Sequence, residues 1–433
     1  MAPRAKKKPA VLDKQPVDVA GLRARTSAAA EQKEHEEEPE ELEEFRRSPA
    51  PLPAATHPPL TALAHFCRIW LMKIIAFLGL RLIRLLRPAP PETRPSFTRR
   101  YACRPGLEVR FFVPPPALAT AGLKEKEQTR ETPLYIDIHG GGFAVGDAEL
   151  DDAFCSGWAR RTGMLVASLS YRKAPRHPVP TAAGDVAALA AAVIADDDLP
   201  RRIRIDRSRV VCGGFSAGGN LCLAASLLAP LSGKVRAAVS YYPIVDFSSP
   251  PHQKYADRLY KGGRRAATTT TTTSAARSVE ATAKGGAAAA AGQVIEDEFD
   301  SIATSGPCLD WGYVPVGHNR KDPVLSPRYA ARRDQLPPSV CLVGAQHDML
   351  CREAREMAHW LARRPVPARG APGWEDSWED CGRRYKWVLA KGARHAFAED
   401  FRREKSARAD RRREFADGIF DDVHRWLRET VLV

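Results

Sequence analysis

The sequence has few cysteines and no Cys-X-X-Cys pair, with nine Cys among its 433 residues. That number is too small for a scaffold held by disulfides, and the missing pair excludes a zinc ribbon and a thioredoxin-like site. The first twenty residues lack the apolar core of about 7–15 residues that a secretory signal requires, so we expect none. A hydrophobic fraction of 44% excludes a wholly disordered or collagen-like chain. The remaining possibility is a large globular domain with added segments.

Positive charge is concentrated in two short stretches, and the formal net charge is +14. Residues 1–60 hold 10 basic and 11 acidic residues, whereas residues 61–104 hold nine and one, and residues 401–413 hold seven and two. Basic clusters attract phosphate on nucleic acid or on anionic lipid. No helix-turn-helix or zinc-finger pattern accompanies them, so we expect no nucleic-acid partner. We interpret the second cluster as the solvated face of a helix.

The first hundred residues divide into two segments. Residues 1–60 combine an acidic run, Glu31–Glu44, with a proline-rich stretch, Pro49–Pro59, and neither offers much apolar surface to bury. We predict a disordered tail and linker there. Residues 61–100 are predicted to form an amphipathic helix and a linker, and the large domain is placed in residues 101–433.

The segment Thr61–Arg87 contains no proline, which predicts a helix. At 100° per residue, four basic side chains fall within about 120° of one another: Lys73, Arg81, Arg84 and Arg87. Three interpretations stay open: a helix on a membrane surface, a single-pass anchor, and a helix packed on the domain. A basic residue at the centre of a spanning helix costs about 2.5–3.5 kcal/mol, which favours the membrane surface. We therefore expect a membrane-associated protein, for example at the endoplasmic reticulum, with the cytoplasm as the alternative.

From residue 107 onward, apolar segments of strand length alternate with segments of helix length. Strands are predicted at 107–113, 134–138, 164–170, 209–213, 235–242, 339–344 and 385–391, and helices at 181–195, 217–229 and 398–432. This alternation predicts an α/β fold with a mostly parallel sheet and ligand sites beyond the carboxyl ends of the strands. Two insertions interrupt it: the low-complexity segment 264–292 and residues 365–380, for which we predict a surface loop.

One serine lies in a Gly-X-Ser-X-Gly pattern directly after a predicted strand. The sequence GFSAG, residues 214–218, follows the strand at 209–213 and precedes a predicted helix. The small residues allow a tight turn that exposes the serine, and the helix N-terminus stabilises negative charge close to it. This context indicates a nucleophile at Ser216.

Three consecutive glycines, residues 140–142, follow the strand at 134–138 and the histidine His139. Such a run exposes backbone N–H groups that can hold a negatively charged oxygen. Paired with Ser216 on a later strand, the run predicts an oxyanion hole.

A serine hydroxyl needs a base, and the base needs an acid to orient it. In this type of fold the order along the chain is serine, acid, histidine. Asp348 follows the strand at 339–344 and His395 follows the strand at 385–391, which is this order. His347 is a rival base, but it precedes the acid. We therefore predict a catalytic triad of Ser216, Asp348 and His395.

Together these motifs resemble the hormone-sensitive-lipase-like branch of the α/β hydrolases, from about residue 130 to the C-terminus. The resemblance rests on HGGGF (139–143), YRKAPRHPVPTAAGDV (171–186), GFSAGGN (214–220), DPVLSP (322–327), GAQHDML (344–350) and His395. It implies the α/β-hydrolase fold: a mostly parallel central sheet, helices on both faces, and a cap over the active site that contains the insertion 264–292. By the same resemblance Gly141, Gly142 and Ala217 form the oxyanion hole, supported by His139 and Gly140.

The resemblance also implies an activity: a serine hydrolase that cleaves carboxylic esters through an acyl-enzyme, with neither a metal nor an organic cofactor. The expected partners are a small-molecule or lipid ester and a membrane surface at residues 61–87. Two alternatives stay open, an arylformamidase-type amide hydrolase and a hydrolase-fold protein that binds a ligand without turnover. Phe215 stands where the family has Asp, and Ala396 follows the histidine where the family has Gly. Both departures bear on the pocket wall or on the position of the imidazole.

Overall fold

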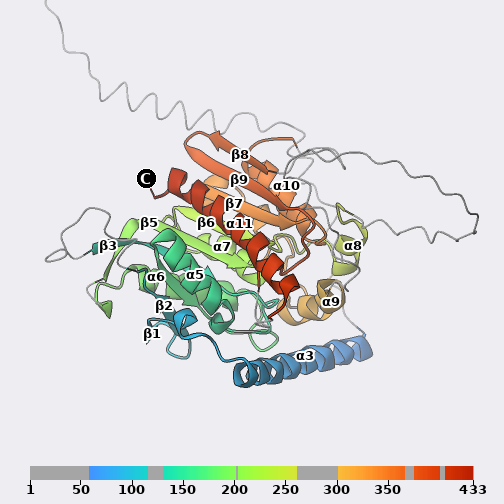
Figure 1. Cartoon of the computed structure of the whole chain (residues 1–433). Coiled ribbons are helices and arrows are strands. Elements are labelled where there is room, and N and C mark those ends of the chain that lie inside the picture. Colours follow the sequence, from blue (N-terminus) through green and yellow to red (C-terminus); the bar gives the residue numbers. More distant parts are fainter. Residues whose placement is uncertain are drawn as a thin grey trace, which may run out of the picture. The chain divides into compact units, whose positions relative to one another are not determined.

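The computed structural model describes residues 58–115, 130–200, 203–260, 301–365, 375–399 and 405–432, which all belong to one compact unit, Pro51–Val433. Of the tail and linker predicted at residues 1–60, residues 1–57 lie outside the described residues, as does the insertion 264–292, whereas Leu60 belongs to a helix that begins at Pro59. The helices are α3 (Pro59–Leu86), α5 (Asp152–Thr162), α6 (Thr181–Ile194), α7 (Ala217–Ser226), α8 (Pro251–Ala256), α9 (Ser301–Tyr313), α10 (Cys351–Leu361) and α11 (Ala407–Thr430) (Figure 1). The strands are β1 (Phe97–Arg100), β2 (Glu108–Phe112), β3 (Arg130–Ile138), β4 (Leu165–Leu169), β5 (Ile203–Phe215), β6 (Ala237–Tyr241), β7 (Ser339–Ala345), β8 (Glu375–Asp380) and β9 (Arg383–Ala390).

Within the described ranges, these strands form one sheet in the order β1-β2-β4-β3-β5-β6-β7-β9-β8. The strands from β4 to β9 in this order pair in parallel, whereas β1, β2 and β8 join antiparallel at the edges. Every residue of β4, β6 and β7 is buried, as expected for parallel strands covered on both faces. The predicted α/β class and mostly parallel sheet are confirmed. The carboxyl ends of the parallel strands meet at one edge.

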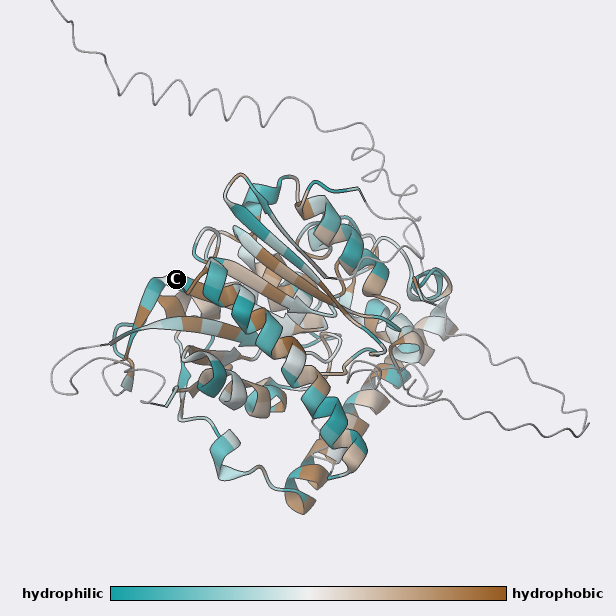
Figure 2. Ribbon diagram, turned by 45° about the horizontal axis from the view of Figure 1, so that its top comes forward, coloured by the Kyte–Doolittle hydropathy of each residue, from teal (hydrophilic) through white to brown (hydrophobic). Residues whose placement is uncertain are grey.

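The helix α3 precedes the sheet and packs on one side against α9. Ile69 is fully buried, and a Cβ placed on Gly312 of α9 would lie 2.5 Å from its Cδ1. Lys73 Nζ donates to the carbonyl oxygens of Ala144 and Ala174 at 2.9 and 2.7 Å. Figure 2 shows hydrophobic residues along much of this helix. Among the described helices, none is long and apolar enough to cross a membrane.

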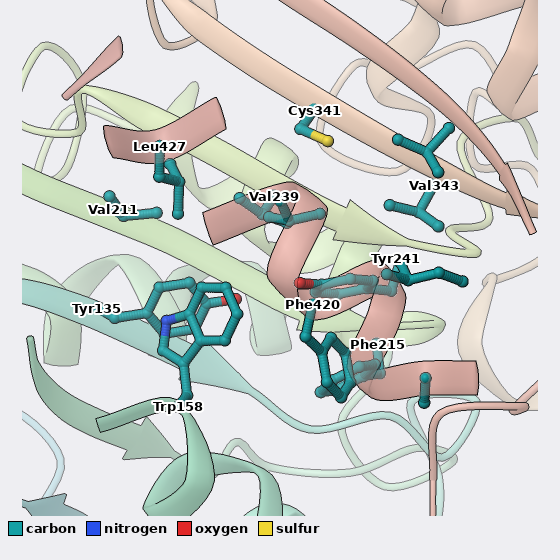
Figure 3. Packing of buried hydrophobic residues seen from close by; sticks show 14 of the residues in the cluster. Tyr135, Trp158, Val211, Phe215, Val239, Tyr241, Cys341, Val343, Phe420 and Leu427 are labelled. Carbon is teal, nitrogen blue, oxygen red and sulfur yellow. The ribbon is translucent and has the colours of Figure 1, made fainter. Parts of the chain in front are cut away.

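One hydrophobic core lies between the sheet, α5 and α11 (Figure 3). Along β6, Val239 and Tyr241 point into this core. Successive side chains of a strand alternate between its two faces. Ser240 accordingly points the other way, where its hydroxyl donates to the carbonyl oxygen of Gly219 in α7 at 2.6 Å. Helices therefore cover both faces of the sheet, and β6 is fixed from both sides.

The last helix begins later than the sequence predicts, because α11 starts at Ala407 within the predicted helix at 398–432. Ile419, Val423 and Trp426 are buried against the sheet side. Phe415 is 39% exposed, and its ring lies 5.6 Å from that of Phe397. The residue that fills the core instead is Phe420, whose ring lies 5.0 Å from that of Phe154 and 5.6 Å from that of Tyr241.

Two edge strands differ from the sequence prediction. β1 falls in the predicted linker and pairs with β2, so the sheet begins before residue 101. β8 falls in the predicted surface loop at 365–380 and pairs with β9. The strand reads EDSWED, without apolar alternation, and it pairs with the basic start of β9, where Arg384 lies 3.6 Å from Glu379. Pairing of opposite charges across strands stabilises this edge, and a pattern within one segment does not reveal it.

We expect Phe420→Ala to lower the free energy of unfolding by about 3–5 kcal/mol, because it leaves a cavity among aromatic rings. The matched control is Phe415→Ala on the same helix, where an exposed ring is removed and the loss should be about 1 kcal/mol or less. Urea denaturation of both variants measures the difference. Equal losses would contradict the placement of Phe420 in the core.

Candidate active site

The turn that presents Ser216 joins β5 to α7. Ser216 has φ 53° and ψ −114°, a strained conformation for a residue with a side chain. Its backbone N–H donates to the carbonyl oxygen of Tyr241 at 2.9 Å. A Cβ placed on Gly214 or on Gly218 would overlap the carbonyl oxygen of Ile138. The close approach of β3, β5 and α7 therefore requires both glycines, and it holds the serine in the strained conformation.

Ser216, His395 and Asp348 lie together at the carboxyl ends of β5, β9 and β7. Ser216 Oγ is 2.8 Å from His395 Nε2, and His395 Nδ1 is 2.6 Å from Asp348 Oδ2. Asp348 Oδ1 accepts from the backbone N–H of Leu350 at 2.9 Å. The Asp348 side chain is fully buried, whereas that of His395 is 11% exposed and Ser216 is 7% exposed. The structure thus brings the three sequence-predicted residues into one hydrogen-bonded chain.

Two neighbours of His395 were missed by the sequence analysis. The ring of Tyr242 meets the imidazole edge-on at 5.0 Å. Tyr242 directly follows β6, so the rule that sites lie at the carboxyl ends of strands could have identified it. A Cβ placed on Gly140 would lie 2.9 Å from Glu399 Oε1, which puts this carboxyl beside the glycine run. Burial raises the pKa of Glu399, and nearby His395 opposes that shift. No sequence motif marks this residue.

The glycine run lies against the serine turn. A Cβ placed on Gly140 would lie 3.6 Å from Ser216 Cβ. Gly141 and Gly142 have φ of 105° and 58°, which residues with a side chain rarely adopt. Gly142, Ser216 and Ala217 line one cavity. Ala217 begins α7, and the first N–H groups of a helix have no acceptor within it. Gly142 and Ala217, two of the predicted oxyanion donors, therefore lie beside the serine, and Gly141 immediately precedes Gly142.

His139 supports the glycine run from its buried side. Its Nδ1–H donates to the carbonyl oxygen of Gly140 at 2.6 Å, and its ring stacks on Tyr171 with centroids 4.4 Å apart. The Tyr171 hydroxyl lies 3.2 Å from the carbonyl oxygens of His139 and Gly140. Burial lowers the pKa of His139 well below its usual value, so the ring stays neutral. These contacts fix the backbone of the loop at His139 and Gly140.

The cavity beside Ser216 has a volume of about 50 Å³ and a mainly apolar lining. Its wall comes from the segment after β6, from α8 and α9, and from the turn after β7. The apolar lining includes Ile244, Phe247, Ile302, Leu309 and Met349. A Cβ placed on Gly142 would lie 2.5 Å from Leu309 Cδ1, so α9 closes directly onto the glycine run. This is the region where the resemblance implied a cap.

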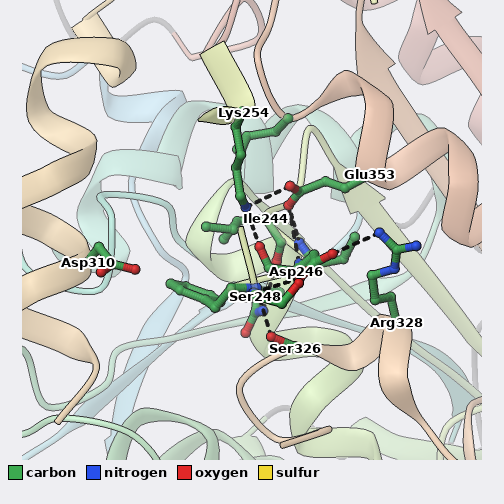
Figure 4. A network of polar contacts seen from close by, with 12 residues as sticks. Ile244, Asp246, Ser248, Lys254, Asp310, Ser326, Arg328 and Glu353 are labelled. Carbon is green, nitrogen blue, oxygen red and sulfur yellow. Dashed lines mark hydrogen bonds and ion pairs between the residues drawn. The ribbon is translucent and has the colours of Figure 1, made fainter. Parts of the chain in front are cut away.

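Lys254, which also lines the cavity, belongs to a buried ion network (Figure 4). Its Nζ lies 2.6 Å from Glu353 Oε2 and donates to the carbonyl oxygen of Asp246. Burial raises the pKa of Glu353 to about 7 although Lys254 opposes this. Asp246 pairs with Arg328 at 2.8 Å, and this cation and Lys254 lower the Asp246 pKa against the effect of burial. The network fixes the loop after β6, and no motif in the sequence marks Lys254 or Glu353.

The two departures from the family motifs affect different parts of the molecule. Phe215 points into the core, where its ring lies 4.8 Å from both Phe154 and Tyr241, and it does not line the cavity. Ala396 has φ 61°, a conformation that glycine adopts without strain and that costs an alanine about 1–2 kcal/mol. His395 nevertheless keeps both of its hydrogen bonds within the predicted triad.

The rival base His347 takes a different place. Its backbone N–H donates to the carbonyl oxygen of Ala393 at 2.9 Å. Burial lowers the pKa of its side chain, and the cations Arg394 and Arg258 lower it further. The hydrogen-bond partner of Ser216 Oγ is His395.

Asp137 lies on β3 just before the glycine run and is fully buried. Its Oδ2 accepts from Ser168 Oγ at 2.8 Å and from Cys155 Sγ at 3.3 Å. Burial raises its pKa from 3.8 to about 7. The Asp137 carboxyl group, which ionises near neutral pH, therefore lies at the end of the strand that precedes the glycine run.

Comparison with known proteins agrees with this geometry. Residues 135–291 match the family model described as alpha/beta hydrolase fold. The chain is 43% identical over 90 residues to carboxylic ester hydrolase LipN of Mycobacterium tuberculosis, covering 21% of this chain and 23% of that protein. It is 30% identical over 158 residues to neutral cholesterol ester hydrolase 1 of Rattus norvegicus, covering 34% and 36%. An esterase of Pyrobaculum calidifontis superposes with a TM-score of 0.54 at 18% identity, covering 84% of this chain and 94% of that one.

The chain therefore has the α/β-hydrolase fold. The family model matches residues 135–291, which is less than half of the chain, and over those residues it confirms the resemblance found in the sequence. The sequence matches span less than half the length of either curated relative.

We expect Gly218→Ala to lower the free energy of unfolding by more than about 3 kcal/mol, because the added methyl group overlaps the backbone of β3. Gly184→Ala is the matched control, since Gly184 lies in α6 with no atom within 4 Å of an added Cβ. This control should be neutral or stabilising by up to about 1 kcal/mol. Thermal and urea unfolding compare the two, and a tolerated Gly218→Ala would contradict the packing of the turn.

The raised pKa of Asp137 predicts a pH-dependent stability difference. Between about pH 4 and 7 the folded chain retains a proton that the unfolded chain releases, so this residue lowers the free energy of unfolding as pH rises through that window. The stability of Asp137→Asn relative to the unchanged protein should therefore be higher at pH 7.5 than at pH 4.5. Urea denaturation at both values measures it.

Asp206→Asn is the control for this titration. Its neighbours Ser208 and Arg209 lower the Asp206 pKa against the effect of burial, so Asp206 is largely ionised in both the folded and the unfolded chain at pH 4.5 and at pH 7.5. Its stability difference should not change between pH 4.5 and 7.5. If the stability difference between Asp137→Asn and the unchanged protein also stayed constant between pH 4.5 and 7.5, the burial of an un-ionised Asp137 carboxyl would be contradicted.

Proposed function

We propose that this protein is a serine hydrolase that cleaves carboxylic esters through an acyl-enzyme intermediate. The proposal rests on one observation: Ser216 Oγ, His395 and Asp348 form a continuous hydrogen-bonded chain that ends at an apolar cavity. The names of the related proteins, a carboxylic ester hydrolase and a cholesterol ester hydrolase, support the same reaction.

In the first half of the proposed reaction, Ser216 Oγ attacks the ester carbonyl carbon and its proton passes to His395 Nε2. Asp348 accepts a hydrogen bond from Nδ1–H and stabilises the imidazolium that forms. Because Asp348 is fully buried and also accepts from Leu350 N–H, it holds the ring in one orientation. The carbonyl oxygen becomes negatively charged and is held by the backbone N–H groups of Gly142 and Ala217, with Gly141 beside them.

The tetrahedral intermediate then collapses, and the alcohol leaves with the proton from His395 Nε2. In the second half, a water molecule gives its proton to His395 and attacks the acyl group on Ser216. Collapse of the second intermediate releases the carboxylic acid and returns the proton to Ser216 Oγ. Each step uses only the groups of the triad and the oxyanion donors.

The cavity supports a substrate whose part next to the carbonyl is small and apolar. Leu309 and Phe247 offer no charge, and the one ammonium group in the lining, that of Lys254, is paired with Glu353. An ethyl acetate hydrolase of Pseudomonas putida is 34% identical over 157 residues, covering 34% of this chain and 45% of that protein, which supports a short acyl group. Amide hydrolysis of the arylformamidase type would use the same triad. A direct comparison of the hydrolysis rates of ester and amide substrates therefore distinguishes the two activities.

With p-nitrophenyl acetate as substrate, we expect Ser216→Ala and His395→Ala each to lower kcat by at least about 10⁴-fold. The double variant should lose little more, because the two residues act as a unit. His347→Ala is the matched control and should retain activity close to that of the unchanged protein. Steady-state kinetics test this assignment, and loss on His347→Ala with retention on His395→Ala would overturn it.

Labelling separates an enzyme from a binding protein of the same fold. A fluorophosphonate should modify Ser216 in the folded protein and leave the Ser216→Ala variant unmodified, as shown by mass spectrometry. A folded protein that is neither labelled nor active would favour the binding-protein alternative.

A further inference from the structure

The outer side of α3 exposes a row of large apolar side chains. Eleven of them are at least 47% exposed: Leu60, Leu63, Phe66, Leu71, Ile74, Ile75, Phe77, Leu78, Leu82, Leu85 and Leu86. At 100° per residue they cover an arc of about 200° along a helix about 40 Å long. Soluble monomers rarely expose an apolar patch of more than a few hundred Å². We call this surface the outer arc of α3.

The inner side of α3 is attached to the domain. Ile69 packs on α9, and the ring of His65 lies 6.1 Å from that of Trp311. Two of the four residues in the predicted basic face also bind inward: Lys73 donates to two loop carbonyls, and Arg84 lies 2.7 Å from Glu149. The predicted basic face is therefore divided, because Lys73 and Arg84 turn toward the domain. The inner side of the helix thus combines the buried Ile69 with polar and basic side chains, whereas the outer arc is mainly apolar.

A helix that is apolar around most of its circumference is normally covered on all sides. The domain covers only the inner side of α3, and the contacts of Lys73 and Arg84 fix its rotation, so the outer arc is held away from the domain. The sequence of α3 contains no acidic residue, whereas Arg68 and Arg81 are exposed on it. The outer arc thus combines apolar surface with positive charge alone.

We infer that the outer arc of α3 docks on an anionic lipid surface, with the helix axis in the plane of the interface. The apolar side chains enter the acyl region, and Arg68 and Arg81 meet the phosphate groups of the lipids. A second copy of the chain fits this surface less well. Two such helices would oppose like charges, and one helix would cover only part of an arc of about 200°.

This docking would place the candidate active site close to the lipid. α3 packs on α9, and α9 supplies Ile302, Gly306 and Leu309 to the lining of the cavity beside Ser216. A single helix therefore separates the outer arc from the cavity. If the protein is the ester hydrolase proposed above, on which this step rests, the placement favours esters that are dissolved in the lipid phase as substrates.

The test uses the full chain and vesicles of phosphatidylcholine with phosphatidylserine. The unchanged protein should float with these vesicles and bind less to phosphatidylcholine alone. The triple variant Leu71→Ser, Leu78→Ser, Leu82→Ser removes apolar surface from the outer arc without altering charge, and its vesicle affinity should fall at least about tenfold. The matched control is Tyr255→Ser, Val316→Ser, Phe415→Ser, which removes three exposed apolar side chains outside α3 and should change affinity less than about twofold.

Circular dichroism and thermal unfolding establish that both triple variants are folded, and Leu78→Ser alone provides a milder change if the triple variant unfolds early. Docking is overturned if the unchanged protein floats with neither vesicle or if the triple variant floats equally well. It is also overturned if sedimentation shows a dimer that the triple variant dissociates while flotation is absent. Hydrolysis of p-nitrophenyl acetate in solution keeps the two proposals apart. Its retention in a protein that does not float overturns docking alone, and its absence in a protein that floats overturns the hydrolase alone.

Discussion

The site depends on the close approach of three backbones at the carbonyl oxygen of Ile138. β3 ends there, Gly214 near the end of β5 lies beside it, and Gly218 in the first turn of α7 packs against it. No side chain fits between these elements, so the chain is forced to turn sharply and the strain falls on Ser216. The same contact places the glycine run against the serine turn, because the run begins two residues after Ile138. One steric constraint thus positions the proposed nucleophile and the proposed oxyanion donors together.

The parallel sheet supplies the other two residues of the site. Ser216, Asp348 and His395 are far apart in the sequence, yet each follows a strand, and β5, β6, β7 and β9 lie side by side in register. Because all these strands run in one direction, their ends meet at one edge and their following turns converge. The short loops then need only small adjustments, such as the left-handed Ala396 after the histidine. Burial of Asp348 and the edge of Tyr242 fix the imidazole further.

Much of this arrangement could be predicted from the sequence, because local rules determine it. Strand length, glycine spacing and the order serine, acid, histidine identified Ser216, Asp348 and His395 before their distances were known. Lys254 and Glu353 could not be found in that way, since a buried ion pair between two separate helices leaves no pattern in either segment. β8 was missed for a similar reason, because its stability comes from charges on β9. The direction of the basic residues of α3 also depended on the neighbour of that helix, since Lys73 and Arg84 turned toward partners distant in the sequence.

The hydrogen bonds of Lys73 make α3 part of the unit that folds together with the sheet. Its ammonium group satisfies the carbonyl oxygens of Ala144 and Ala174, one just after the glycine run and the other in the segment that follows β4. Without α3, both acceptors would lose a charged donor, and an unsatisfied buried carbonyl costs about 1–3 kcal/mol. A residue that precedes every strand of the sheet in the chain thus completes the loop that lies behind the site. α3 therefore belongs to the folding unit that contains the sheet.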